Sequence, residues 1–202
     1  AAGTMGGIGL TPADRAVLGT QYVDVGIAEE QAVAMASGLA RGGARPIFGT
    51  YSTFFQRVYD QMSQDVAVNN NPAVFLSTYA TLYGMNDVTH LGFFDIPLFA
   101  NIPNLVFLAP AGIEEYLAVL RWALAQTAHP VMIRVPVMGY ETSPYPVRTD
   151  YSALNRYQVV TEGTEVAIIG AGNFAQMASD AAAVLAKDGV HATVINPIFL
   201  SG

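Results

Sequence analysis

The chain has 202 residues, of which 52% are hydrophobic and 12% charged, so it can build one large domain or one domain and part of a second. Its net charge of −7 has the wrong sign for binding the phosphates of nucleic acid, and no uncharged run approaches the ~18 apolar residues that span a membrane. Because it has no cysteine and a single lysine, Lys187 at a predicted helix end, thiol chemistry is excluded and Schiff-base chemistry is set aside.

Two hydrophobic periods alternate along the chain. Apolar residues spaced i, i+3, i+4 and i+7 predict helices at 32–39, 55–66, 113–124 and 174–185. Short apolar runs bounded by Pro, Gly or Asn predict buried strands at 45–51, 73–77, 105–108, 131–135, 166–169 and 192–195. Strands that alternate with helices of this length are joined by right-handed crossovers. The sequence therefore predicts an α/β fold with a parallel sheet covered by helices on both faces.

A segment rich in proline and tyrosine divides this pattern. Residues 136–158 follow neither period and are predicted to be a linker that completes a first domain, 1–158. Residues 159–202 hold one strand, helix, strand unit, which is too small for a core of its own and is predicted to start a second, incomplete α/β domain. Gly170-Ala171-Gly172 in that unit superficially matches a dinucleotide fingerprint, but the acidic residue expected about 20 positions later is missing. We expect no nucleotide site there.

Two adjacent carboxylates, Glu29 and Glu30, follow a mostly apolar stretch and open a predicted helix. From this segment alone, a simple interpretation is sufficient: acidic residues in the first turn complement the helix dipole, at about 0.3–1 kcal/mol each. A catalytic interpretation needs support from the wider sequence.

Three motifs together form a more specific pattern. They place a glutamate at the start of a helix, an aromatic residue early in the next one and a histidine in a loop: Gly26-Ile27-Ala28-Glu29, Tyr51-Ser52-Thr53-Phe54 and Thr89-His90-Leu91-Gly92-Phe93-Phe94-Asp95. With these motifs the chain resembles, over nearly all its length, the 1-deoxy-D-xylulose-5-phosphate synthase family of transketolase-type enzymes, which use thiamine diphosphate. The resemblance implies that 1–158 form a pyrimidine-binding domain and that 159–202 begin the family's C-terminal domain.

In that family a separate N-terminal domain holds the cofactor's diphosphate and a Mg²⁺ ion. Residues 1–7 carry neither a signal peptide nor an initiating Met, so we expect the chain to begin within a longer protein and the diphosphate-binding domain to lie outside it. Asn69-Asn70-Asn71 lack the Gly-Asp-Gly that precedes the asparagine in the family's metal motif. We therefore predict no metal ligand in this chain.

The resemblance assigns catalytic roles to Glu29 and His90. The family's glutamate hydrogen-bonds the pyrimidine ring and activates the cofactor, and its histidine handles oxygen atoms of the substrate. Tyr51, Phe54 and Arg57 match cofactor-binding residues, with Phe54 at the position of the aromatic that stacks on the pyrimidine. Tyr51 ends a predicted strand, and Phe54 and Arg57 share one face of the next helix, so all three can meet at the carboxyl edge of the sheet. Without the resemblance, core packing of Phe54 and a structural role for His90 would be the simpler interpretations.

The chain departs from the family where that family grips the acceptor's phosphate. Tyr79 and Val137 replace two arginines, which removes charge-assisted contacts to a phosphate dianion, and Asn86, beside Asp87, replaces a frequent aspartate. Arg134 is the nearest other cation in sequence, but strand alternation points it away from the face of Val137.

The resemblance implies a cytoplasmic homodimeric enzyme that decarboxylates pyruvate and condenses the two-carbon unit with an aldehyde, nominally glyceraldehyde 3-phosphate. Its partners would be these small molecules and the diphosphate-binding domain or subunit. One alternative is a transketolase-like paralogue or split-transketolase subunit that uses another aldehyde. The other is a catalytically silent fragment or partner subunit.

Overall fold

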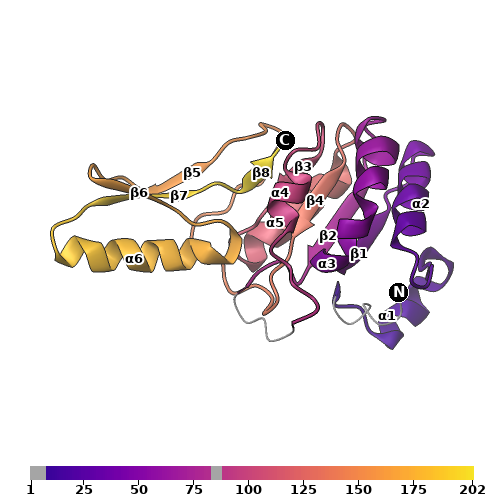
Figure 1. Ribbon diagram of the computed structural model, residues 1–202, viewed down its shortest axis with the longest axis horizontal. Helices are drawn as coiled ribbons and strands as arrows, with labels where there is room; N and C mark the ends of the chain where they lie inside the picture. Colours follow the sequence, from indigo (N-terminus) through magenta and orange to yellow (C-terminus); the bar gives the residue numbers. More distant parts are fainter. Residues whose placement is uncertain (1–7, 83–87) are drawn as a thin grey trace.

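A five-stranded sheet forms the centre of the structure, a computed structural model that describes residues 8–82 and 88–202 (Figure 1). Its strands, in spatial order, are β1 (Ile47–Tyr51), β2 (Val74–Thr78), β4 (Val131–Arg134), β3 (Val106–Leu108) and β8 (Phe199–Ser201). The first four run parallel, and β8 pairs antiparallel with β3 at the edge. The predicted α/β class with a mostly parallel sheet is confirmed.

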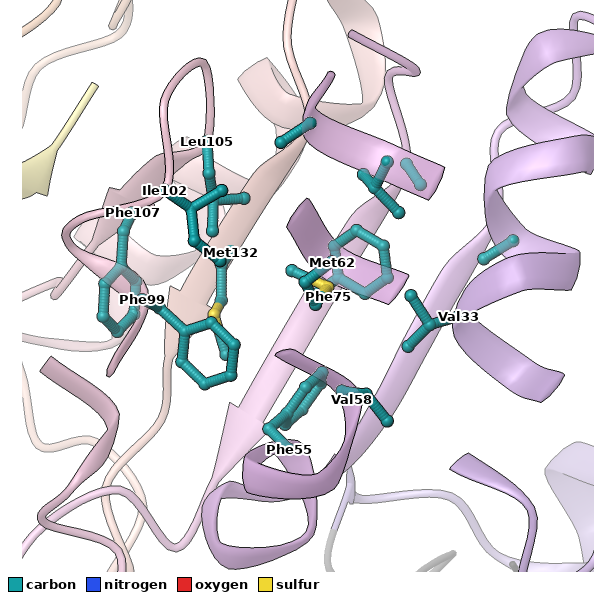
Figure 2. Packing of buried hydrophobic residues seen from close by; sticks show 14 of the residues in the cluster. Val33, Phe55, Val58, Met62, Phe75, Phe99, Ile102, Leu105, Phe107 and Met132 are labelled. Carbon is teal, nitrogen blue, oxygen red and sulfur yellow. The ribbon is translucent and has the colours of Figure 1, made fainter. Parts of the chain in front are cut away.

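Helices cover the first face of this sheet and enclose the larger part of the core. They are α2 (Glu29–Arg41), α3 (Ser52–Phe55), the 3-10 helix η4 (Gln56–Val58) and the π-helix η5 (Gln61–Ala67). Figure 2 shows Val33 of α2 and Met62 of η5 packed with Phe75 of β2 on this face. Phe75 and Met132 point to this side because alternate residues of a strand face opposite sides of the sheet.

The second face is covered by α5 (Ile113–Ala125). Val119 and Trp122 of this helix pack on Val74 of β2 and Ile133 of β4, the strand neighbours of the residues that face the other side. The prediction that helices cover both faces is therefore confirmed. The central strands β2, β3 and β4 are buried throughout because helices shield both of their faces from water.

The predicted single helix at 55–66 is wrong in its continuity. The chain instead forms α3, η4 and η5, three successive helical segments with different hydrogen-bond spacings. Phe55, Val58, Met62 and Val66 are nevertheless all buried, as the apolar spacing predicts. The spacing therefore identifies the residues that face the core, but it does not fix the hydrogen-bond spacing of each turn.

Two short helices were not predicted from the apolar spacing. The first, α1 (Pro12–Leu18), precedes the 3-10 turn η3 (Gly19–Gln21) and buries none of its residues, so it has no apolar face to detect. A capping box starts it, because Thr11 and Asp14 satisfy each other's backbone N–H groups. The second, α4 (Asp95–Phe99), has only five residues.

A smaller sheet lies beside the larger one. Its strands are ordered β5 (Gln158–Thr161), β7 (Ala192–Asn196) and β6 (Val166–Ile169), with β7 antiparallel to β5 and parallel to β6. The turn η6 (Gly172–Phe174) leads into α6 (Ala175–Lys187), which runs along this sheet (Figure 1). After β7 the chain crosses into β8 of the larger sheet, so residues 159–202 contribute to both sheets. Within the described ranges, no helix has the length and apolar character that crossing a membrane requires.

Candidate active site

The structure distinguishes the two adjacent glutamates of the predicted site. Glu29, the first residue of α2, is buried, whereas Glu30 is exposed. Nη1 of Arg57 donates a hydrogen bond to Oε2 of Glu29 over 3.2 Å. Burying a carboxylate is costly unless it has an opposite charge and a hydrogen bond, and Arg57 provides both. Complementing the helix dipole does not require burial, so that interpretation suits Glu30 and is insufficient for Glu29.

Four aromatic rings gather where β1 and β2 end. The Tyr51 ring lies 5.8 Å from Phe54 at an interplanar angle of 20°, and 5.6 Å from His90 at 88°. Phe54 and His90 are 5.3 Å apart, edge to face. Tyr79, which the sequence singled out only as a replacement for an arginine, lies 4.3 Å from Tyr51 and completes the cluster. We call these four residues the aromatic cluster.

The aromatic cluster is half-buried, and its chemistry reflects that setting. Burial, followed by the neighbouring Tyr79, raises the pKa of the Tyr51 hydroxyl above its usual value, so this residue is a neutral hydrogen-bonding group at physiological pH. Oγ1 of Thr89 lies 2.9 Å from Nδ1 of His90, and this contact orients the imidazole.

The aromatic cluster and the Glu29–Arg57 pair belong to one edge of the sheet. Phe54 lies in α3 and Arg57 in the adjoining η4, so one short helical run carries a member of each group. This is the carboxyl edge of the parallel strands, where ligands bind in open α/β sheets. The structure thus forms two groups, the rings of Tyr51, Phe54 and His90 and the ion pair of Glu29 with Arg57. Phe54 and Arg57, in adjoining helical segments, link the two groups along the chain.

Two further charged residues at this edge were not predicted as a pair. Asp95 opens α4 and Arg134 ends β4, and both are buried. Nε of Arg134 donates to Oδ2 of Asp95 over 2.7 Å, and Nη2 donates to Oδ1 over 3.3 Å and to the Gly92 carbonyl over 3.2 Å. Burial raises the pKa of the Asp95 carboxyl, and the ion pair with Arg134 opposes that rise. The sequence does contain one clue to this pair. Each charged residue lies between apolar neighbours, and a charge in an apolar environment is expected to pair with an opposite charge.

The remaining residues singled out from the sequence are placed as follows. Val137 lies three residues beyond the end of β4 and is half-buried. Asn86 and Asp87 lie outside the described residues. Within 8–82 and 88–202, no three acidic or histidine side chains are arranged to hold a metal ion.

These residues fit one end of thiamine diphosphate. A flat pyrimidine ring suits the apolar faces of Tyr51 and Phe54, and a ring nitrogen suits the buried carboxyl group of Glu29. The diphosphate end does not fit the same residues, because Arg57 and Arg134 are already paired with carboxylates of this chain. Among the described residues, this edge therefore suits the pyrimidine end of the cofactor better than its diphosphate end.

Fold and site together define a domain of the transketolase type. The family model described as "Transketolase, pyrimidine binding domain" matches residues 7–142, and the chain belongs to that family. The model described as "Transketolase, C-terminal domain" matches residues 155–201.

Curated relatives point to one branch of this group. Proteins named 1-deoxy-D-xylulose-5-phosphate synthase are 40% identical over 180 residues in Symbiobacterium thermophilum and 39% identical over 194 residues in Thermomicrobium roseum. The alignments cover 89% and 96% of this chain but only 28% and 31% of those proteins. The chain thus spans about three tenths of the length of the curated relatives it matches.

Solved structures agree with the fold. A split-gene transketolase described as an inactive β4 tetramer has a TM-score of 0.75 at 24% identity, and the match covers 92% of this chain and 60% of that one. A transketolase variant from Pichia stipitis has a TM-score of 0.77 at 20% identity, covering 86% of this chain and 26% of that one. At these identities the likeness establishes the fold alone.

Proposed function

We propose that this chain supplies the pyrimidine-binding part of a thiamine diphosphate-dependent transferase of the 1-deoxy-D-xylulose-5-phosphate synthase type. The observation that carries the proposal is the buried Glu29, paired with Arg57 and set beside the half-buried aromatic cluster at the carboxyl edge of the sheet. The identity to synthases over most of this chain supports the same assignment.

Each residue has a distinct task in this proposal. When bound, the cofactor supplies the electron sink for breaking a carbon–carbon bond next to a carbonyl group. The Glu29 carboxyl group holds a proton against the pyrimidine ring nitrogen, and Arg57 keeps that carboxyl in place. Phe54 and Tyr51 bind the flat ring and exclude water from it. His90 holds or donates a proton at an oxygen atom of the substrate.

The proposed donor is pyruvate, and the proposed acceptor is glyceraldehyde 3-phosphate or a related aldehyde. A diphosphate-binding domain or subunit would supply the Mg²⁺ and the diphosphate ligands, in a cytoplasmic homodimer. The deciding experiment assembles the chain with that domain and measures CO₂ release from pyruvate, with and without an aldehyde. Release that depends on Glu29 supports the proposal, and a complete lack of turnover would favour a catalytically silent partner subunit.

One observation favours a second candidate, a transketolase-like protein with a different acceptor. Tyr79 presents an aromatic ring where the synthase family presents an arginine, and that ring packs on Tyr51 at 4.3 Å. Turnover of pyruvate and of a ketose donor, measured side by side, separates the two candidates. Preferential use of the ketose would select the second.

A further inference from the structure

A buried ion pair anchors the loop that carries His90. Asp95 is 1% exposed and Arg134 9%, and their side chains meet through the two donations from Nε and Nη2 described above. We propose that Arg134 and Asp95 are positioning residues, which hold His90 against the rings of Tyr51 and Phe54. This inference rests on the proposed function, because it gives His90 its purpose.

The ion pair ties three separate segments together. Arg134 ends β4 and Asp95 opens α4, while the Gly92 carbonyl that Nη2 also binds lies between His90 and α4. The planar fork of an arginine can bind both carboxylate oxygens and a carbonyl at fixed angles, which a lysine cannot. The loop is thus fixed at positions 92 and 95, and His90 projects two residues before the first of these points.

Close backbone packing leaves this loop little freedom. A Cβ atom added at Gly92 would lie 1.6 Å from the carbonyl oxygen of Tyr79, so only glycine fits there. Tyr79 itself has a φ of +57°, a strained conformation for a residue other than glycine. The N–H of Ala80 donates to the Val135 carbonyl over 3.0 Å, which attaches this strained segment to the chain just after β4. The end of β4 therefore contacts two of the segments that contribute to the aromatic cluster: Arg134 binds the His90 loop at Gly92, and Val135 binds the segment after Tyr79.

The proposed role of His90 requires that its side chain be held in a precise position. A side chain that handles substrate oxygens must be held within about 0.5 Å of its productive position, and a displacement of about 1 Å lowers the rate on the order of a hundredfold. Thr89 orients the imidazole of His90, but both residues lie in the same loop, so the position of the pair depends on what anchors that loop. The buried ion pair is that anchor.

NMR spectroscopy of the three histidines tests this directly, because His129 and His191 serve as internal controls. In the wild-type chain, the ring protons of His90 should be displaced from the values of a solvated histidine by the ring currents of Tyr51 and Phe54, and they should show cross-relaxation with these rings. Arg134→Met and Asp95→Asn should move these signals toward the values of a solvated histidine, and Arg134→Lys should move them part of the way. The signals of His129 and His191 should stay.

A matched control removes a different buried charge. Glu115 in α5 is 2% exposed and accepts a hydrogen bond from the Ala111 N–H over 2.7 Å, so Glu115→Gln should leave His90 unchanged. If Arg134→Met fails to fold, which the signals of His129 and His191 would reveal, Arg134→Lys and Asp95→Asn decide. Unchanged His90 signals in these folded variants, equal displacement in Glu115→Gln, or no cross-relaxation in the wild type would each overturn the proposal.

A second readout is kinetic. In the assembled enzyme, Asp95→Asn should lower kcat on the order of ten- to a hundredfold while the KM for thiamine diphosphate stays near that of the wild type. A fall in kcat accompanied by an equally large rise in the KM for thiamine diphosphate would indicate a general structural defect and contradict the positioning role. The NMR measurement needs neither cofactor nor partner. The NMR experiment can therefore confirm that Arg134 and Asp95 hold His90 in place even if Glu29 proves dispensable for catalysis. Conversely, the proposed function is not refuted if the NMR experiment shows no anchoring.

Discussion

Replacing Glu29 with glutamine separates its chemical role from its structural one. Glutamine keeps the size of the side chain but cannot hold the acidic proton. The Arg57 side chain, its partner at 3.2 Å, is 49% exposed, so its charge regains water when the pair is lost. Because the lost pair is partly exposed and a buried charge disappears with it, we expect the free energy of unfolding to change by about 1 kcal/mol or less.

The effect on chemistry should be far larger. A positioned acid or base contributes typically 10²- to 10⁴-fold to a rate, which corresponds to roughly 2.7–5.4 kcal/mol of transition-state stabilisation. The assay is exchange of the thiazolium proton of thiamine diphosphate for deuterium in the assembled enzyme, followed by turnover of pyruvate. Glu29→Gln should nearly abolish both, and the unfolding curve should stay in place.

The neighbouring residue provides the control. Glu30→Gln removes the same charge one position along α2, but from an exposed side chain, so exchange and turnover should remain near those of the wild type. If Glu29→Gln retains exchange within a few-fold of wild type, roughly 1 kcal/mol, Glu29 only complements the helix dipole and the proposed mechanism is refuted.

Three further predictions concern the cofactor, the acceptor and the backbone. The 202-residue chain alone should bind thiamine diphosphate weakly or not at all, because both arginines at the site are already paired; a micromolar Kd by calorimetry with Mg²⁺, about −8 kcal/mol, would contradict this. Since Tyr79 and Val137 cannot neutralise a phosphate, glyceraldehyde and glyceraldehyde 3-phosphate should differ by less than about a hundredfold in kcat/KM, roughly 2.7 kcal/mol, and Tyr79→Arg should increase the preference for the phosphate; a much larger preference in the wild type would show another phosphate site. Gly92→Ala should lower the free energy of unfolding by about 1–3 kcal/mol or more because of its clash with Tyr79. Gly38→Ala, exposed in α2 with nothing within 4 Å, should raise it by about 0.5–1 kcal/mol; similar denaturant curves for the two variants would be inconsistent with this packing.

Hydrophobic spacing predicted the centre of the sheet because every residue of β2, β3 and β4 is buried. It missed α1, since a helix that buries nothing has no apolar face, although Thr11 and Asp14 carried a capping signal. It also missed β8, whose three residues follow a turn in which Ile198 has a φ of +59°. That antiparallel pairing depends on where β3 lies in space, which local spacing does not encode.

Sequence motifs identified the residues of the candidate site, but they did not identify the ion pair that anchors the His90 loop. Tyr51, Phe54 and His90 belong to motifs, and the structure brings their rings within 6 Å of one another. The pairing of Asp95 with Arg134 joins residues 39 positions apart, and no local period relates them. Only the three-dimensional path of the loop over the sheet edge makes that contact visible.

The antiparallel strand β8 means that the two family segments do not correspond to two separable building blocks. The segment matched by the C-terminal model ends inside the sheet of the pyrimidine-binding segment, where Phe199 pairs with Leu108. A protein cut between the two matches would lose this cover and expose the backbone N–H and C=O groups along the edge of β3, which is a template for aggregation. Exchange of such segments between related proteins, in evolution or by recombination in the laboratory, therefore has to carry β8 along with the domain whose sheet it completes.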